Sequence, residues 1–175
     1  MTTSLTGPVR SVADIPTRPD RNRMRAETGA RLRAAMAERG VGALILLGNN
    51  AVTYATGTSW PLGDAGLSHV ERPVALVLAD DPAPHLFLPF REGAAEETEL
   101  PADHLHGPVY LEFDEGVEHF AGIVAGLVPR GTAVAVDELT GAMRRCASLL
   151  FPDGAPGDAA VIVGGAKTVD RKSTR

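Results

Sequence analysis

The segment from Gly42 to Gly57, with the sequence GALILLGNNAVTYATG, constrains the fold of this chain more than any other. The continuous apolar run after Gly42 is typical of a strand that is buried in a sheet. Asn49 and Asn50 follow it, and asparagine is a preferred residue at the start of a helix. Gly57 supplies a residue that readily ends a helix. The segment therefore predicts a buried strand, an Asn-capped turn and one short helix.

A long helix is expected immediately before this segment. Asp20 can cap a helix that runs from Arg21 to Arg39, and Gly40 can close it. Several residues recur at helical spacing on one face of this helix and are expected to point inward: Met24, Thr28, Leu32, Ala35 and Met36.

The rest of the chain alternates apolar, strand-like runs with helical patterns. The expected strands are Pro73–Leu78, His85–Pro89, Pro108–Phe113, Thr132–Val136 and Ala159–Val163. The expected helices are a short acidic one that opens at Phe90, one capped by Asp114 and one from Thr140 to Leu150. This alternation, interrupted by one hairpin, predicts an α/β layered domain with a mixed sheet.

Length and composition exclude several classes of protein. A chain of 175 residues suits one domain. A formal net charge of −5 argues against a nucleic-acid-binding surface, and no apolar run approaches the roughly 20 residues of a membrane span. Cys146 is the single cysteine, which excludes an internal disulfide and favours the cytoplasm. Residues 1–19 lack the apolar core of a secretory signal, and we expect a mobile N-terminal arm there.

Common catalytic and metal-binding motifs are absent from the sequence, including HExxH, GxSxG, CxxC and GxGxxG. His104 and His106, with Asp103 beside them, come nearest to a metal pair. Two histidines in a loop supply two ligands at best, whereas zinc needs three or four. We therefore interpret them as surface histidines and expect no metal in this chain.

Two further patterns are interpreted as non-catalytic. The run from Val163 to Thr168 contains Gly, Lys and Thr but lacks the glycine spacing of a phosphate loop. Cys146 follows two arginines, which can lower the pKa of a thiol. Without a positioned histidine, we interpret it as an inert, half-buried thiol.

The order of a long Arg-rich helix, then GVGALILL, then NNAVTYATGTSW resembles the N-terminal domain of the aminopeptidase P, prolidase and creatinase family. The resemblance implies a mixed six-stranded, ribonuclease-H-like sheet flanked by helices, over residues 20–166. It also implies that Lys167 and Thr168 open a linker helix, so that residues 167–175 begin the linker. The pita-bread catalytic domain of that family would follow Arg175 and is absent from this sequence.

The connection from Thr58 to Arg72 is long and carries the single tryptophan, which makes it the favoured place for function. In the resembled family the corresponding loop reaches toward an active site, often that of the partner subunit. The resemblance makes Trp60, His69 and Arg72 candidates for substrate contact. Arg72 suits a carboxylate, Trp60 a cation or the exclusion of water, and His69 hydrogen bonding or titration. The structural alternatives are that Trp60 plugs the edge of the domain and that Arg72 pairs with Glu71 or faces solvent.

The resemblance implies a non-catalytic N-terminal domain of an Xaa-Pro peptidase-like or creatinase-like hydrolase, which shapes the substrate pocket and the dimer. Its partners would be the missing C-terminal catalytic domain, a second copy of the parent chain and a small-molecule or peptide substrate. No cofactor is expected in this chain, whereas the catalytic domain of peptidase members binds a divalent metal pair (Mn, Zn or Co). The alternative is a stand-alone α/β module that binds a small ligand or a partner. A small independent hydrolase ranks last.

The last six residues, Asp170 to Arg175, depart from the expected linker. One reading frame of a common sequencing adapter, GATCGGAAGAGCACACGT, encodes the same Asp-Arg-Lys-Ser-Thr-Arg. We hypothesise that residues 170–175 are derived from an adapter, and the alternative is a natural polar terminus. Resequencing of the native locus tests the hypothesis, which continuous coding DNA for these six residues would defeat.

Overall fold

The computed structural model describes residues 21–58, 70–89 and 98–173. Three sequence predictions therefore lie outside the described residues. These are the mobile arm, the acidic helix that opens at Phe90, and the placement of Trp60 and His69.

A six-stranded mixed sheet forms the centre of the molecule, with the strand order β4-β3-β2-β1-β5-β6. The strands are β1 (Ala43–Leu46), β2 (Val74–Leu78), β3 (His85–Phe87), β4 (Leu105–His106), β5 (Val134–Val136) and β6 (Gly157–Asp158). The pairs β1–β2 and β2–β3 are antiparallel, whereas β3–β4, β1–β5 and β5–β6 are parallel. The expected mixed six-stranded sheet is confirmed.

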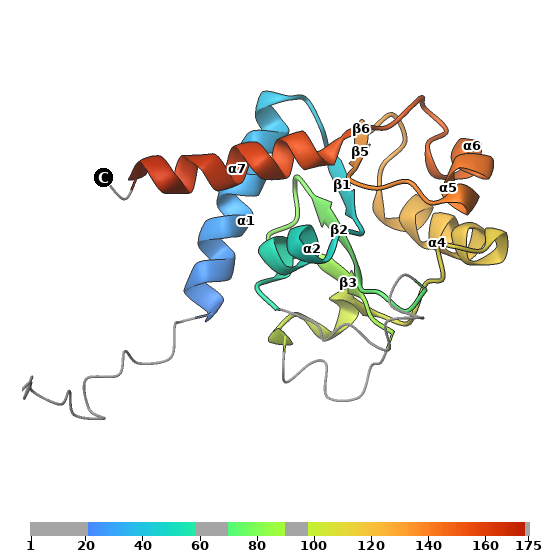
Figure 1. The fold of residues 1–175 in the computed structure, drawn as a ribbon, viewed down its shortest axis with the longest axis horizontal. Coiled ribbons are helices and arrows are strands. Elements are labelled where there is room, and N and C mark those ends of the chain that lie inside the picture. The colour runs from blue at the N-terminus through green and yellow to red at the C-terminus, as the bar shows by residue number, and fades with distance from the viewer. Residues whose placement is uncertain (1–20, 59–69, 90–97, 174–175) are drawn as a thin grey trace, which may run out of the picture.

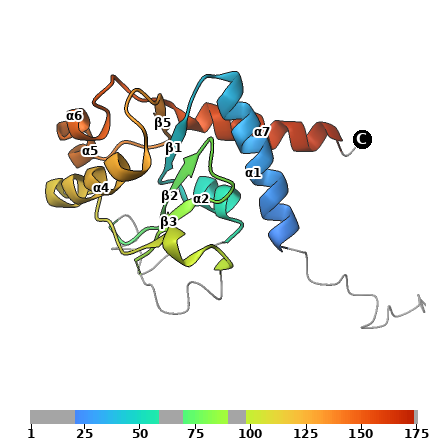
Figure 2. The same ribbon diagram turned by 180° about the vertical axis from the view of Figure 1, so that it is seen from behind.

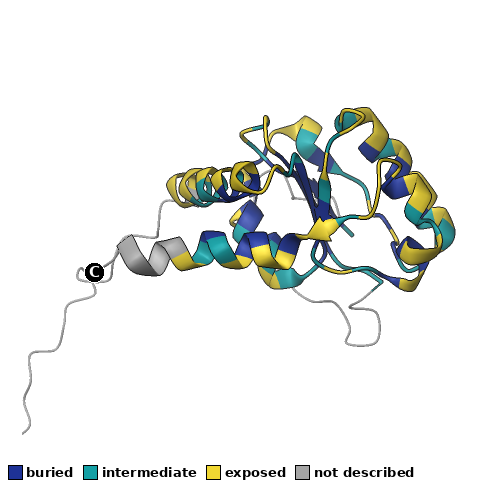
Figure 3. Ribbon diagram, turned by 90° about the horizontal axis from the view of Figure 1, so that it is seen from above, coloured by how far each residue is buried: buried dark blue, intermediate teal, exposed yellow. Residues whose placement is uncertain are grey.

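Helices cover both faces of the sheet, which gives three layers (Figures 1 and 2). One layer contains α1 (Arg21–Glu38), α2 (Asn49–Thr56) and α7 (Ala159–Ser173), in which α1 and α7 pack against each other. The other contains α4 (Asp114–Leu127), α5 (Gly141–Arg145) and α6 (Ala147–Leu150). Seen from above, the buried residues lie toward the sheet and the exposed residues toward the outside (Figure 3).

The side chains of β1 and of Leu47, which follows it, alternate between the two faces of the sheet and are buried on both. Leu44 and Leu46 belong to the core under α1, α2 and α7, whereas Ile45 and Leu47 belong to the core under α4. All four are at most 1% exposed. Burial of one such side chain stabilises the fold by about 1.5–3 kcal/mol, so the apolar run is the centre of both cores, as the sequence predicts.

The long N-terminal helix is confirmed with one correction. Leu32 and Met36 are fully buried and Ala35 is nearly so, but Met24 is 50% exposed. The inward-facing stripe therefore covers the C-terminal half of α1, where Leu32, Ala35 and Met36 join the core. Gly40 adopts a left-handed conformation just beyond the end of the helix (φ 63°), which a glycine adopts without steric cost.

Two expected strands are wrong. The run from Ala159 to Val163 forms the first turns of α7, and the short strand β6 precedes it. Ala159, Ile162 and Ala166 are buried at helical spacing. Asp158 starts the helix, because its Oδ1 accepts a hydrogen bond from the Ala160 N–H at 2.8 Å.

The strand expected over Pro108–Phe113 is also misplaced, since β4 ends before it and this segment is irregular. The helix expected from Thr140 to Leu150 is divided at Cys146 into α5 and α6, and Thr140 is its N-cap, with the hydroxyl accepting from the Met143 N–H at 3.1 Å. Asp114 is the first residue of α4 and Phe113 its N-cap.

None of the helices in the described ranges has both the length and the apolar character needed to cross a membrane.

Candidate functional site at the carboxyl ends of β1 and β5

The parallel strands β1 and β5 end at the same edge of the sheet, with Ile45 opposite Val136 in the register. Strand β1 leads into Leu47 and Gly48, and β5 leads into Asp137 and Glu138. Ligands of open α/β sheets bind outside the carboxyl ends of the strands. This edge is therefore the first place to look for a site.

The carboxylate of Asp137 holds the turn that connects β1 with α2. Its Oδ1 accepts from the Leu47 N–H at 2.8 Å and its Oδ2 from the Gly48 N–H at 3.0 Å. Burial raises the pKa of Asp137, and the two backbone hydrogen bonds oppose that shift. A Cβ atom at Gly48 would lie 3.0 Å from the same Oδ2, so this close approach favours a residue without a side chain.

The expected asparagine cap of α2 is wrong. Gly48 is the N-cap residue, and no side chain forms the capping hydrogen bond. Asn49 and Asn50 already lie within the first turn of the helix. The buried Oδ1 of Asn49 has no hydrogen-bond partner among the described residues. Gly57 ends the helix as predicted, in a left-handed conformation.

Arg72, the one described residue of the three substrate-contacting candidates, lies at this edge. Its Nη1 lies 2.7 Å from Oε2 of Glu138, and its Nη2 lies 3.1 Å from Oε1 of Glu112. The Arg72 side chain is 16% exposed, compared with 28% for Glu112 and 51% for Glu138. The guanidinium thus connects the segment before β2 with the segments that precede α4 and follow β5. Both partners differ from those of the structural alternative, Glu71 and solvent.

A hollow of about 620 Å³ opens beside Asp137, between the start of α2 and α7. Its lining includes Gly48, Asn49, Asn50, Asp137, Glu138 and Lys167. The ammonium group of Lys167 lies 5.1 Å from the centre of the Tyr54 ring, within the range of a cation–π interaction. The hollow therefore presents carboxylates, amides and one ammonium group, which suit the binding and orientation of a small polar ligand.

Lys167 does not belong to a phosphate loop, because the preceding Gly164 and Gly165 lie inside α7. The prediction that Lys167 and Thr168 open the linker helix is also corrected. The hydroxyl of Thr168 donates to the carbonyl of Gly164 at 2.7 Å, which is a contact within a helix that began at Ala159.

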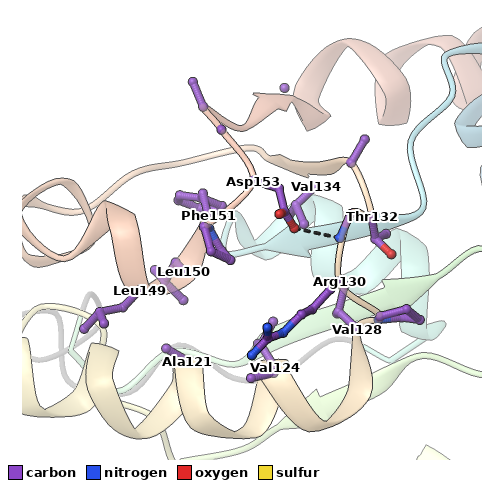
Figure 4. A pocket seen from close by; sticks show the side chains of 18 of the residues that line it. Ala121, Val124, Val128, Arg130, Thr132, Val134, Leu149, Leu150, Phe151 and Asp153 are labelled. Atoms are coloured by element: carbon purple, nitrogen blue, oxygen red, sulfur yellow. Dashed lines mark hydrogen bonds between the residues drawn. The ribbon is translucent and has the colours of Figure 1, made fainter.

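A second cavity, of about 650 Å³, lies at the opposite end of β5. Ala121, Val124 and Val134 contribute to its apolar lining, together with the chain from Leu149 to Phe151 (Figure 4). At its margin the Gly131 N–H donates to Oδ2 of Asp153 at 2.7 Å. This cavity suits an apolar group.

Cys146 is a half-buried free thiol. Desolvation raises its pKa, and the nearby carboxylate of Asp114 adds to the effect, whereas Arg145 opposes it. The expected lowering by arginine is therefore outweighed. A raised pKa reduces the thiolate fraction, in keeping with the interpretation of an inert thiol.

His104 and His106 are partly buried, whereas the sequence analysis interpreted them as surface histidines. The structure brings His104 together with His85 and Asp81, which the sequence analysis did not single out. His104 thus belongs to a group of three possible ligands, and His106, its expected partner, is not one of them. No local pattern in the sequence reveals this group, because the pairing of β3 with β4 brings His104 to His85.

The strand order and the three layers define an α/β domain with a mixed six-stranded sheet between two layers of helices. The sequence profile of the Creatinase/Prolidase N-terminal domain matches residues 30–161. The chain belongs to this family.

Solved structures share the fold at low sequence identity. The N-terminal domain of the cytoplasmic peptidase PepQ from Mycobacterium tuberculosis H37Rv has a TM-score of 0.51 at 16% identity, and the match covers 81% of this chain and 97% of that one. A proline dipeptidase from Streptococcus pneumoniae has a TM-score of 0.51 at 17% identity and coverages of 83% and 96%. The prolidase from Pyrococcus horikoshii OT3 has a TM-score of 0.50 at 13% identity, with 78% of this chain but 33% of that chain covered. No curated protein matched this sequence.

Proposed function

We propose that this chain acts as the non-catalytic N-terminal domain of an Xaa-Pro peptidase-like or creatinase-like hydrolase in the cytoplasm, where it shapes the substrate pocket and the dimer. The family match over residues 30–161 supports this role. The Pyrococcus horikoshii prolidase supports it as well, because the shared fold accounts for 33% of that longer chain.

The observation that carries the substrate role is the arrangement of Arg72. Glu112 is the less exposed partner and anchors one Nη atom, whereas Glu138 is half exposed and binds the other. An exposed ion pair contributes only about 0–1 kcal/mol. A substrate carboxylate can therefore displace Glu138 while Arg72 stays held by Glu112, and an arginine–carboxylate contact then orients the charged end of the substrate.

The described residues do not fit the divalent metal pair (Mn, Zn or Co) that peptidase members bind. A two-metal site needs ligands for two ions about 3.5–4 Å apart. The described residues contain one close group of three ligating side chains, Asp81, His85 and His104. We therefore assign bond cleavage to a separate catalytic domain and derive no catalytic step for this chain.

Three measurements test the proposal. The purified chain, supplied with Mn²⁺ and an Xaa-Pro dipeptide, should release no proline, and turnover abolished by a point change within this chain would refute the role. Reading the genomic sequence beyond codon 169 should reveal a continuing frame with spaced Asp, Asp, His, Glu and Glu. In the two-domain protein encoded by such a frame, light scattering should show a homodimer.

The same two-domain protein tests Arg72 directly. The substitution Arg72→Gln should raise KM for an Xaa-Pro dipeptide at least tenfold, because a substrate contact is lost. Arg144→Gln is the matched control, since Arg144 is exposed on α5. Equal KM values for the two variants would show that Arg72 does not contact the substrate.

A second candidate function is a stand-alone module that binds a small ligand, and the hollow beside Asp137 and Lys167 favours it. A native stop codon after Arg175, together with tight binding of a small carboxylate by the isolated chain, would support this function over the first. Lys167→Gln should then weaken binding.

A further inference from the structure

We propose that Asp81, His85 and His104 form a binding site for one Zn²⁺ ion within this domain. The proposal stands independently of the proposed function, because it uses other residues at the other end of the sheet order. It departs from the sequence expectation of a metal-free domain, since the tertiary structure supplies ligands that are remote in sequence.

Strand pairing assembles the three ligands. In the parallel pair β3–β4, Leu86 lies opposite Leu105 and Phe87 opposite His106. One residue earlier in each segment lie His85, the first residue of β3, and His104, just before β4, and their rings stack with centroids 4.2 Å apart. Asp81 lies four residues before His85, in the turn that joins β2 to β3.

The ligating atoms converge on one oxygen. Oδ2 of Asp81 lies 3.7 Å from Nε2 of His85 and 3.7 Å from Nε2 of His104. Ligand atoms of a tetrahedral zinc ion lie about 3.3 Å from each other, given metal–ligand distances of about 2.0–2.1 Å. All three ligand atoms lie within 4.8 Å of one another, so the group is wider than an occupied site and has to contract around the ion. The two stacked rings need to turn so that their nitrogen lone pairs meet at the ion.

Neighbouring groups orient two of the ligands. Oδ1 of Asp81 accepts a hydrogen bond from the Ala83 N–H at 3.0 Å, which leaves Oδ2 for the ion. Nδ1 of His85 lies 3.1 Å from Nε2 of His106. When Nδ1 of His85 carries the proton and donates a hydrogen bond to Nε2 of His106, Nε2 of His85 keeps its lone pair. Metal-binding histidines commonly have such an oriented second nitrogen.

Burial disfavours the protonated, positively charged form of His85. The side chains of His85, His104 and Asp81 are 6%, 13% and 24% exposed. Desolvation lowers the pKa of His85, and the adjacent His104 adds to that effect. The buried Nδ1 of His104 has no hydrogen-bond partner among the described residues. A neutral imidazole is the form that binds a metal, so the surroundings favour the ligating state.

The donor set selects the ion. Two imidazoles and one carboxylate suit Zn²⁺ and other first-row transition ions, whereas Mg²⁺ and Ca²⁺ prefer oxygen ligands. Three protein ligands leave one tetrahedral position for water. The structure thus indicates a mononuclear zinc site with a bound water molecule, held by one edge of the sheet.

Titration of the whole chain, stripped with a chelator and dialysed, tests the site. Isothermal titration with ZnCl₂ should give one equivalent bound, and Co²⁺ should produce the visible absorption bands of a tetrahedral complex. Zinc should raise the melting temperature, because a ligand that binds the folded state stabilises it. MgCl₂ should cause none of these changes.

Substitutions locate the binding. Asp81→Asn keeps Oδ1 for the Ala83 N–H and replaces Oδ2 by an amide, so it should fold and bind zinc at least tenfold more weakly. His104→Gln should behave alike. His119→Gln is the control, since His119 is exposed on α4, and it should bind as the wild type does. Absence of stoichiometric zinc binding, or equal affinity in the control and the Asp81→Asn variant, would overturn the proposal.

Discussion

Gly116 allows a quantitative test of how α4 packs against the segment before it. A Cβ atom at this position would lie 2.1 Å from the carbonyl oxygen of Tyr110 and 2.7 Å from its carbon. Ordinary contacts between a carbon and a carbonyl oxygen are about 3.3–3.6 Å long. The Gly116→Ala substitution therefore forces backbone to move by about 1 Å. The same carbonyl accepts from the Phe113 N–H at 3.0 Å, so the substitution should also disturb that turn.

The expected loss follows from two opposing effects. Adding a methyl group to a closely packed position costs about 1–3 kcal/mol. Replacing glycine by alanine inside a helix gains up to about 1 kcal/mol. We expect Gly116→Ala to lower the free energy of unfolding by about 1–2 kcal/mol, which corresponds to a fall of roughly 2–8 °C in Tm. Glu112 lies in the displaced turn, so its ion pair with Arg72 should weaken as well.

Two other glycines of α4 provide matched controls. A Cβ atom at Gly122 or Gly126 would meet no heavy atom within 4 Å, and both positions are exposed. Gly122→Ala and Gly126→Ala should therefore raise the free energy of unfolding by about 0.5–1 kcal/mol each. Urea unfolding followed by circular dichroism measures all three variants. If Gly116→Ala is as stable as Gly122→Ala, the close approach of Tyr110 is incorrect.

Three further predictions use the same unfolding assay. Asp137→Ala leaves two backbone N–H groups without their acceptor and should lower the free energy of unfolding by about 1–3 kcal/mol. Glu138→Ala should change it by less than about 1 kcal/mol. Equal losses would contradict the role of Asp137 in the turn. Because burial raises the pKa of Asp137, the folded state binds its proton more readily than the unfolded state does. The stability of the wild type relative to Asp137→Asn should therefore decrease as the pH rises from below the usual value of 3.8 through the raised pKa, and a pH-independent difference would contradict the shift. Met36→Ala should lower the free energy of unfolding by about 2–5 kcal/mol, whereas Met24→Ala, at a half-exposed position, should change it by less than about 0.5 kcal/mol. A large loss for Met24→Ala would indicate that the inward-facing side of α1 extends to Met24.

Local sequence patterns succeeded where burial is nearly complete. The run from Ala43 to Leu47 is apolar throughout because both of its faces are covered, and Gly57 ends α2 because it adopts a left-handed conformation. The patterns failed at Ala159–Val163, where an apolar run is equally compatible with a helix buried on one side. Helical spacing through Ala166 was the feature that decided between the two.

The site at the carboxyl ends of β1 and β5 was only partly predictable. Arg72 was singled out from the loop that carries it, but its partners Glu112 and Glu138 are 40 and 66 residues away in sequence. The turn before α2 is held by Asp137, which lies 89 to 90 residues away from Gly48 and Leu47 in sequence, and no asparagine side chain caps the helix. Contacts at such separations depend on which strands become neighbours, and local spacing does not encode that order.

The sequence by itself determined that this is an α/β domain, because periodic burial and turn residues act over short distances. The family is a separate finding, which rests on the profile match over residues 30–161. Only the tertiary structure decided which polar groups meet. The parallel pairing of β3 with β4 brought His85 to His104, and that of β1 with β5 brought Asp137 to Gly48. Side-chain chemistry is a property of each residue, whereas a binding site depends on distances that are fixed when the whole sheet assembles.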